Sequence, residues 1–171
     1  MAVVAGQVGV RTPALVGFAP AHPNGFTLAY AAVAGHSLDR ESDGPGFDAM
    51  VGEVWGQVAI LRRSRIAHRD LRLANVFVDD DGAVWLIDFG FSELAADDVL
   101  LDGDVAELLA STASVVGPER AVAAAVPVVG PEAVRSCVHR LRPALLSGAT
   151  RTSLGGQPGV LDRLREMAVT V

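Results

Sequence analysis

The residues that could do chemistry lie in two short segments near the middle of the chain. Residues 68–75 contain Asp70 and Asn75, and residues 88–90 begin with Asp88. Oxygen donors of this kind suit hard divalent cations. A single Asp or Asn in a loop more often caps a turn or faces solvent. The candidate site therefore rests on the combination of these residues and on the elements that position them.

Strand and helix patterns surround both segments. Apolar residues 76–78 and 83–87 enclose the acidic turn 79–82, whose final Asp-Gly pair favours a tight hairpin. Before the first segment, apolar residues recur at helical spacing and predict a helix over about residues 47–64. These apolar positions are Phe47, Met50, Val51, Val54, Val58 and Leu61.

The rest of the chain divides into a short β region and a longer helical region. Two apolar runs, residues 14–18 and 26–33, are separated by a turn with Pro and Gly and predict a pair of strands that forms a hairpin. The order of elements predicts an α+β domain dominated by helix. Further helices, each opened by Asp or Pro, are expected near residues 104–115, 118–126, 131–141 and 158–168.

Both chemical segments match motifs of one known superfamily. Residues 68–75 read HRDLRLAN, which fits the catalytic-loop motif HRDLxxxN, and residues 88–90 read DFG. The chain therefore resembles protein kinases, with lower specificity over about residues 8–126. The resemblance implies a protein-kinase-like fold, mainly the helical C-lobe with its catalytic β-hairpin and a residual strand pair from the N-lobe and hinge.

By this resemblance, ATP and Mg²⁺ are the expected cofactors and four residues carry the chemistry. Asp70 receives the proton of the acceptor hydroxyl, and Arg72 stabilises charge on the transferring phosphate. Asn75 and Asp88 are the expected ligands of the metal ions. Because Asp70 and Asn75 are five residues apart on one loop, a single backbone conformation can hold both in register.

The resemblance also implies residues that support the site. His68 and Arg69 are expected to pack and bond the loop, and Phe89 and Gly90 complete the second motif. Asp104 is similar to the aspartate that braces the kinase catalytic loop from below. Asp104 is equally well placed to open a helix as its N-cap, and the two roles are compatible.

The nucleotide-binding half is where the chain departs from the superfamily. Backbone groups of the expected hinge, Tyr30, Ala31, Ala32 and Val33, are the candidates for contacting adenine. The chain contains no lysine, so it lacks the strand lysine that pairs with a helix glutamate, and the planar fork of arginine does not replace a compact ammonium group. The glycine-rich loop over the phosphates is missing as well.

The expected domain organisation is therefore a truncated kinase. Only about 30 residues precede the hinge, too few for five strands and a helix of usual length. We expect residues 1–36 to form the residual N-lobe and hinge and residues 37–171 the C-lobe, within one structural domain. Either Met1 is an internal start or another chain supplies the missing part.

The segment after residues 88–90 is short and no APE motif follows it. A docked protein segment is therefore not the expected acceptor. The shortened form resembles bacterial lipopolysaccharide and small-molecule kinases, and kinase-like domains attached to membrane proteins of the lysylphosphatidylglycerol synthase type. Aminoglycoside phosphotransferases are also similar, but they usually carry Gly at the position of Arg69.

Composition excludes several function classes. The net charge of −6, without interleaved aromatic and basic residues, argues against nucleic-acid binding. The longest nearly uncharged apolar run, residues 121–130, is far shorter than the roughly 20 residues of a transmembrane helix. No signal-peptide pattern opens the chain, so we expect a cytoplasmic protein. Cys137 is the only cysteine, which excludes an internal disulfide and predicts a buried thiol.

Two classes of function remain open. The first is an ATP- and Mg²⁺-dependent phosphotransferase that acts on an unidentified hydroxyl-bearing acceptor. The second is a catalytically incomplete, pseudokinase-like module whose exposed apolar face binds a partner, such as a chain that carries the missing N-lobe or a membrane domain. A gene fragment is the third interpretation.

Overall fold

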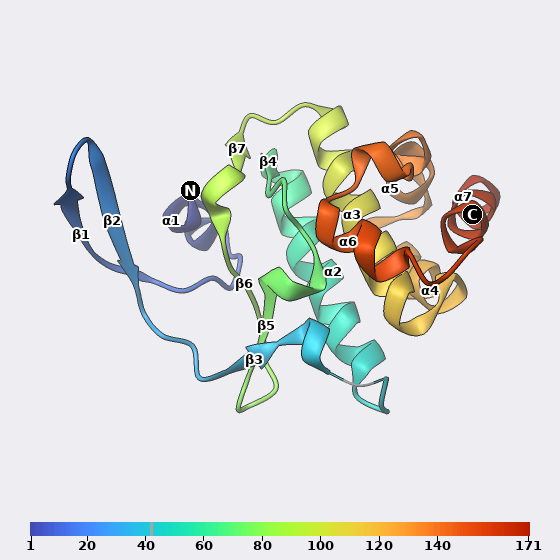
Figure 1. The fold of residues 1–171 in the computed structure, drawn as a ribbon, viewed down its shortest axis with the longest axis horizontal. Coiled ribbons are helices and arrows are strands. Elements are labelled where there is room, and N and C mark those ends of the chain that lie inside the picture. Colours follow the sequence, from blue (N-terminus) through green and yellow to red (C-terminus); the bar gives the residue numbers. More distant parts are fainter. Residues whose placement is uncertain (42) are drawn as a thin grey trace.

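The computed structural model describes residues 1–41 and 43–171 as a predominantly helical body from which one β-hairpin projects (Figure 1). The α+β class predicted from the sequence is confirmed. The helices are α1 (Ala2–Gln7), α2 (Phe47–Arg63), α3 (Asp98–Val116), α4 (Pro118–Val129), α5 (Pro131–Ser136), α6 (Gly148–Leu154) and α7 (Val160–Thr170). The strands are β1 (Leu15–Ala21), β2 (Gly25–Tyr30), β3 (Gly35–Ser37), β4 (Ile66–Ala67), β5 (Val76–Asp79), β6 (Val84–Leu86) and β7 (Glu93–Leu94).

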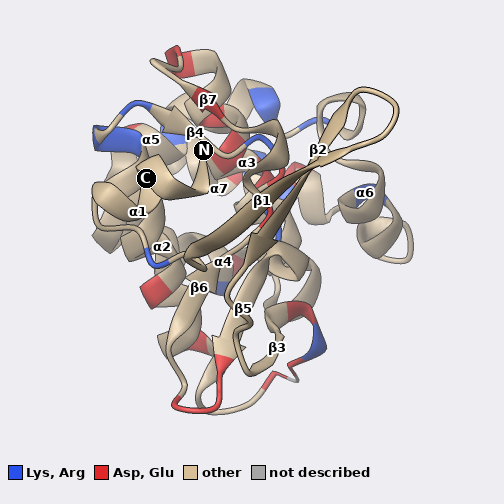
Figure 2. Cartoon of the chain, turned by 90° about the vertical axis from the view of Figure 1, so that its left-hand side faces the viewer, with Lys and Arg blue, Asp and Glu red and all other residues tan. Residues whose placement is uncertain are grey.

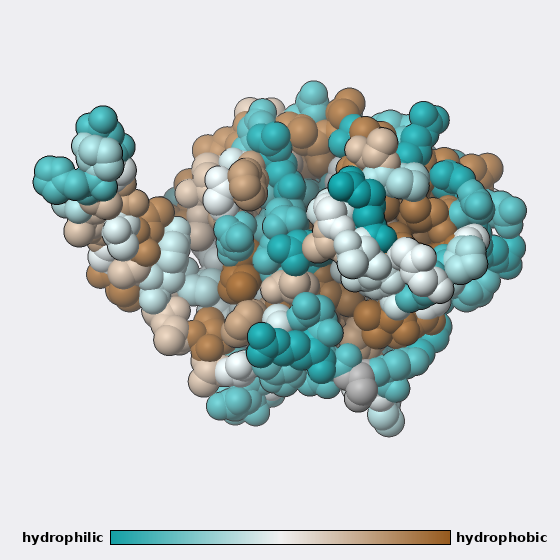
Figure 3. Space-filling model, in the orientation of Figure 1, coloured by the Kyte–Doolittle hydropathy of each residue, from teal (hydrophilic) through white to brown (hydrophobic). Residues whose placement is uncertain are grey.

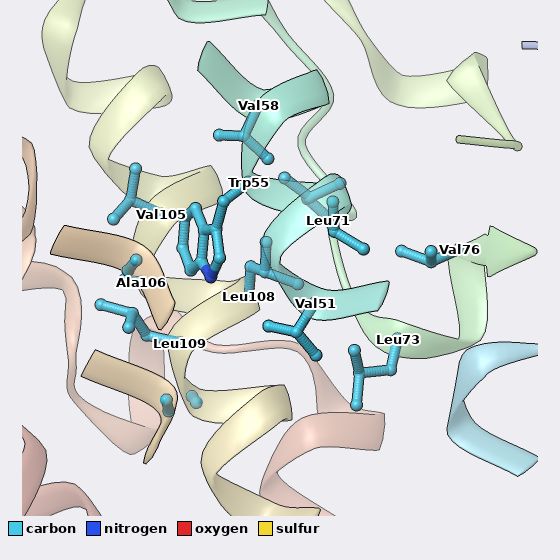
Figure 4. Close-up of a cluster of buried hydrophobic side chains, with 14 of the residues drawn as sticks. Val51, Trp55, Val58, Leu71, Leu73, Val76, Val105, Ala106, Leu108 and Leu109 are labelled. Atoms are coloured by element: carbon cyan, nitrogen blue, oxygen red, sulfur yellow. The ribbon is translucent and has the colours of Figure 1, made fainter. Parts of the chain in front are cut away.

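Helix α2 lies at the centre of the body, and its predicted extent is confirmed to within one residue. Val51, Trp55 and Val58 recur every three or four residues, and all three side chains are buried. They share one core with Leu71 of the candidate catalytic loop and Leu108 of α3 (Figure 4). The candidate catalytic loop is therefore anchored in the same core that stabilises the helices.

The predicted hairpin after the catalytic loop is confirmed as the antiparallel pair β5–β6, with β3 on the other side of β5. Asp79 closes its turn by accepting hydrogen bonds from the Ala83 N–H (2.8 Å) and from Trp85 Nε1 (2.7 Å). These bonds, above all the one from Trp85, lower the pKa of Asp79. Gly82 adopts a φ of +81°, which glycine reaches without strain. The hairpin leads the chain directly into Asp88.

Helix α3 begins earlier than predicted. The sequence pattern placed its start at Asp104, but Asp97 is the N-cap and accepts a hydrogen bond from the Leu100 N–H (2.9 Å). Four aspartates lie within residues 97–104, and spacing alone did not distinguish the one that caps the helix. The N-cap interpretation of Asp104 is therefore wrong, because this residue lies well inside the helix.

The other helices agree with the sequence to different degrees. Helices α4 and α7 lie close to the segments that an opening Pro predicted, and α5 continues beyond its last residue as the short 3-10 turn Cys137–Arg140. Helices α1 and α6 were not predicted. Helix α1 has six residues, too few for stability in isolation. It forms because Ala2 and Ala5 are buried in the main core.

Strands β1 and β2 form the predicted hairpin at the N-terminal end, with Phe18 opposite Leu28 and Pro20 opposite Phe26. The hairpin projects from the body in Figure 1 and stands apart from it in the space-filling view of Figure 3. Almost all of its side chains are at least partly exposed. It contributes nothing to the main core, in contrast to β5–β6.

Two expectations from composition can be compared with the fold. Cys137 is fully buried, as predicted, and burial raises the pKa of its thiol to about 12. Within residues 1–41 and 43–171, no helix has the length and apolar character needed to cross a lipid bilayer.

Candidate active site

Side chains on one face of helix α3 accept hydrogen bonds from the backbone of the candidate catalytic loop, residues 68–75. The Asp104 carboxylate accepts hydrogen bonds from the backbone N–H groups of His68 (2.6 Å) and Arg69 (2.7 Å). Ser111, two helical turns further on, accepts a hydrogen bond from the Leu73 N–H through its Oγ (3.1 Å). Three N–H groups of the loop are therefore fixed by a single rigid element.

Asp104 makes the bracing contact that the sequence suggested, and it does so inside the protein. The residue is 4% exposed. Burial raises the pKa of its carboxyl group to about 7, although the two backbone hydrogen bonds and the charge of Arg62 favour the ionised form. Asp104 is thus a structural residue whose charge state changes near neutral pH.

His68 connects the loop to the strand that precedes Asp88. Its Nε2 lies 2.8 Å from the Ile87 carbonyl oxygen, and its ring centroid is 4.7 Å from that of Phe89. Burial lowers the pKa of His68, which favours the neutral ring. Since a carbonyl oxygen only accepts, Nε2 carries the proton. The packing and bonding expected of His68 and Phe89 are present.

Arg69 contributes to the loop in a different way from the expected packing. Its backbone adopts a φ of +68°, and its N–H is one of the two bonded to Asp104. Its side chain is about half exposed and pairs with Glu93 of β7, with Nη1 3.3 Å from Oε2. The backbone of Arg69 therefore supports the loop, while its guanidinium group lies at the surface.

Asp70, Arg72 and Asn75 form one hydrogen-bonded cluster. Arg72 Nε donates to Asp70 Oδ1 (3.1 Å), and Asn75 Nδ2 donates both to Asp70 Oδ2 (2.7 Å) and to the Asp70 carbonyl oxygen (2.8 Å). Because these two Asp70 atoms only accept, the amide must present its nitrogen to them. Asn75 Oδ1 is left as the donor atom for a cation.

Asp88 lies next to this cluster at the end of the β-hairpin. The Ile87 N–H donates to the Asn75 carbonyl oxygen (3.0 Å), so the residue before Asp88 is bonded to the catalytic loop. Asp88 has a left-handed backbone (φ +61°), and its exposed carboxylate accepts one long hydrogen bond from the Gly90 N–H (3.4 Å). A Cβ at Gly90 would lie 3.1 Å from Asp88 Oδ1, so glycine leaves room for this carboxylate.

The donor atoms of the site suit a hard divalent cation. Asn75 bonds the Asp70 carboxylate through its side chain and the Ile87 N–H through its carbonyl oxygen, which connects Asp70 to the residue before Asp88. Among the described residues, no group of three or more His, Cys, Asp or Glu side chains could hold a metal ion. A cation bound by Asp88 and Asn75 would therefore need phosphate or water oxygens as well, which is the usual situation for Mg²⁺.

A pocket of about 400 Å³ lies beside Asp88 and has the size of a small-molecule site. Of the four residues expected to contact adenine, Tyr30 lines this pocket. Ala31, Ala32 and Val33 do not, and they follow β2 in the connection to β3. The lining residues are Ala2, Thr12, Pro13, Leu28, Tyr30, Ile87, Asp88, Phe89 and Gly90.

Several contributors to the site were missed by the sequence analysis, among them Ser111, Glu93 and Leu28. Ser111 could have been found from its seven-residue spacing to Asp104, which places both on one helix face. Glu93 pairs with Arg69 only because β7 lies beside β4, a pairing of two-residue strands with no sequence signal. Leu28 lines the pocket because of the way the hairpin is positioned, which the local sequence does not specify.

No protein-family model matches the chain, and no curated protein sequence matches it significantly.

Proposed function

We propose that this chain is a protein-kinase-like phosphotransferase that uses ATP and Mg²⁺ to phosphorylate a hydroxyl-bearing acceptor in the cytoplasm. One observation carries the proposal: the hydrogen-bonded cluster of Asp70, Arg72 and Asn75. The brace at Asp104 and the adjoining carboxylate of Asp88 complete the arrangement. Hydrogen bonds therefore connect residues of the site that are far apart in the sequence.

Asp70 is the group that takes the acceptor proton. Its carboxylate is partly exposed, so an acceptor hydroxyl can approach from solvent. The hydrogen bonds from Asn75 and Arg72 hold both of its oxygens in place, which orients the remaining lone pairs toward the hydroxyl. Arg72 also places a positive charge beside Asp70, where the transferring group acquires negative charge.

Asn75 Oδ1 and the Asp88 carboxylate are the groups that would hold Mg²⁺. When bound, the metal supplies neutralisation of the phosphate charge. Tyr30 and the apolar wall of the adjacent pocket would hold the base of the nucleotide. The chain itself thus provides orientation, one base and two cation ligands.

A non-catalytic binding module is the second candidate. Two observations favour it: the chain has no lysine to hold the phosphates, and the β1–β2 hairpin exposes apolar side chains away from the core. In this interpretation the chain binds a partner, such as one that carries the missing N-lobe or a membrane domain. Binding of nucleotide and turnover of nucleotide separate the two candidates.

Nucleotide binding is tested by calorimetric titration with AMP-PNP, a non-hydrolysable ATP analogue, with and without Mg²⁺. We expect Mg²⁺-dependent binding that is lost in Asp88→Asn and kept in Asp80→Asn, an exposed acidic residue of the β5–β6 turn. Equal binding by both variants, or binding that ignores Mg²⁺, would contradict the assignment of Asp88.

Turnover is tested by Mg²⁺-dependent release of phosphate from ATP, with water as the acceptor. Asp70→Asn should lower the rate by about 10²–10⁴-fold, the usual contribution of a positioned base, without weakening AMP-PNP binding. If the unaltered chain binds AMP-PNP but does not release phosphate from ATP, the binding module is the better description. The same conclusion follows if Asp70→Asn releases phosphate at an unchanged rate.

A further inference from the structure

The two faces of the β1–β2 hairpin differ in the size of their side chains. In an antiparallel pair, directly opposed residues lie on the same face. The register places Phe18 with Leu28 and Pro20 with Phe26 on one face, and Tyr30 follows on the same side of β2. We call this the large face. The opposite face, here the small face, carries Gly17, Ala19, Ala21, Gly25, Thr27 and Ala29.

The large face is the most exposed apolar surface of the hairpin. Phe18 and Phe26 are each 73% exposed, Leu28 is 53% exposed and Tyr30 is 41% exposed. Since a large apolar side chain covers roughly 150–250 Å², this surface is on the order of 500 Å². This size is that of the largest apolar patch on a typical monomer, roughly 300–600 Å², and such patches are often interaction sites.

The hairpin also lacks the charges that usually protect exposed strands. No Asp, Glu, Lys or Arg occurs between Arg11 and Asp39, and Figure 2 shows β1 and β2 without acidic or basic residues. Exposed strand edges are usually guarded by charged side chains against association. The net charge of −6 is therefore carried entirely by the rest of the molecule.

We propose that two copies of this chain associate by packing the large faces of their hairpins against each other. A second copy is always present and brings an identical uncharged face, so no charge is buried without a partner. Complete burial of two such faces would remove roughly 1,000 Å² from solvent in total, about the lower limit of a specific interface. Pairing through strand edges instead would leave the large faces uncovered.

The association also concerns the pocket beside Asp88. Leu28 and Tyr30 belong to the large face and also line that pocket, so the end of the large face near Tyr30 is shared with the pocket wall. The proposal goes beyond phosphotransfer and does not depend on it, because the hairpin would associate whether or not the site turns over nucleotide.

The test is the molar mass of the full chain in solution, measured by sedimentation at about 50 µM, above the micromolar range of weak interfaces. We expect twice the chain mass of 17.7 kDa. Phe26→Glu and, independently, Phe18→Glu should halve the observed mass. The helical circular dichroism of the body should stay unchanged, because both side chains lie outside the core.

Thr27→Glu is the matched control, since it puts the same charge one residue away on the small face. It should remain a dimer. Three results would overturn the proposal: the unaltered chain is a monomer, Phe26→Glu remains a dimer, or Thr27→Glu lowers the observed mass as much as Phe26→Glu does. A monomer that instead floats with phosphatidylglycerol vesicles would also overturn it, and would identify a lipid surface as what covers the large face.

Discussion

The helical body and the β1–β2 hairpin use the same residue types in opposite ways. Phe47, at the start of α2, is fully buried, whereas Phe26 in β2 is 73% exposed. The catalytic loop belongs to the first region, because Leu71 and Leu73 anchor it in the core. The body is therefore stabilised by its own packing, while the apolar surface of the hairpin is left uncovered by the rest of the chain.

The largest difference in unfolding free energy between the two regions is expected when one phenylalanine is removed from each. Phe47→Ala should lower the free energy of unfolding by about 3–5 kcal/mol, since it leaves a cavity in a closed core. Phe26→Ala should change it by less than about 0.5 kcal/mol, as expected for an exposed site away from the core. Urea denaturation followed by helical circular dichroism, at a concentration where the chain is monomeric, measures both. Similar losses in the two variants would break the distinction.

The next effect concerns the brace between the body and the catalytic loop. Asp104→Asn presents an amide nitrogen to one of the two N–H groups that the carboxylate now binds, and leaves that donor unsatisfied. We expect a loss of roughly 1–3 kcal/mol in unfolding free energy. Amide hydrogen exchange should accelerate at His68 and Arg69 and remain unchanged in the hairpin. Unchanged exchange at both residues would show that Asp104 is not a brace.

The same variant has a pH dependence. The pKa of Asp104 is raised from 3.8 to about 7 in the folded protein. The folded state therefore holds this proton more tightly, and the resulting stabilisation is present below pH 4 and is lost as pH rises through 7. The difference in unfolding free energy between the original chain and Asp104→Asn should accordingly shrink from pH 5 to pH 8. A constant or growing difference would contradict the burial-driven shift.

The smallest effect is expected at Ser111. Ser111→Ala removes the acceptor of the Leu73 N–H and should cost about 1 kcal/mol. Ser114→Ala is the matched control, because the Ser114 hydroxyl bonds only within its own helix, to the Ser111 carbonyl oxygen. Thermal unfolding distinguishes the two, and an equal loss would remove Ser111 from the brace.

The sequence predicted the elements whose signal is local. The apolar spacing of α2 and the Asp-Gly turn of β5–β6 are short-range patterns, and both elements lie where they were expected. The start of α3 was misplaced because several aspartates compete for the cap, whereas the contact of Asp104 with the loop agrees with the motif resemblance. Helix α1 was missed because it is stabilised by tertiary packing alone.

The candidate site was predictable in its residues but not in its connections. The motif identified Asp70, Asn75 and Asp88, whereas the amide orientation of Asn75 and the contribution of Ser111 depend on contacts between distant segments. The position of Tyr30 beside Asp88 likewise follows from how the hairpin leaves the body. Long-range geometry of this kind has no signature in the local sequence.

The most direct test of the central claim is a titration with Mn²⁺ and AMP-PNP, followed by nuclear magnetic resonance of backbone amides. Paramagnetic Mn²⁺ broadens signals close to it and can replace Mg²⁺ at oxygen ligands. If Asn75 and Asp88 hold the cation, their amide signals should broaden first, before those of the small face of the hairpin. Broadening confined to the acidic turn at Asp80 and Asp81, or no broadening at Asp88, would contradict the account.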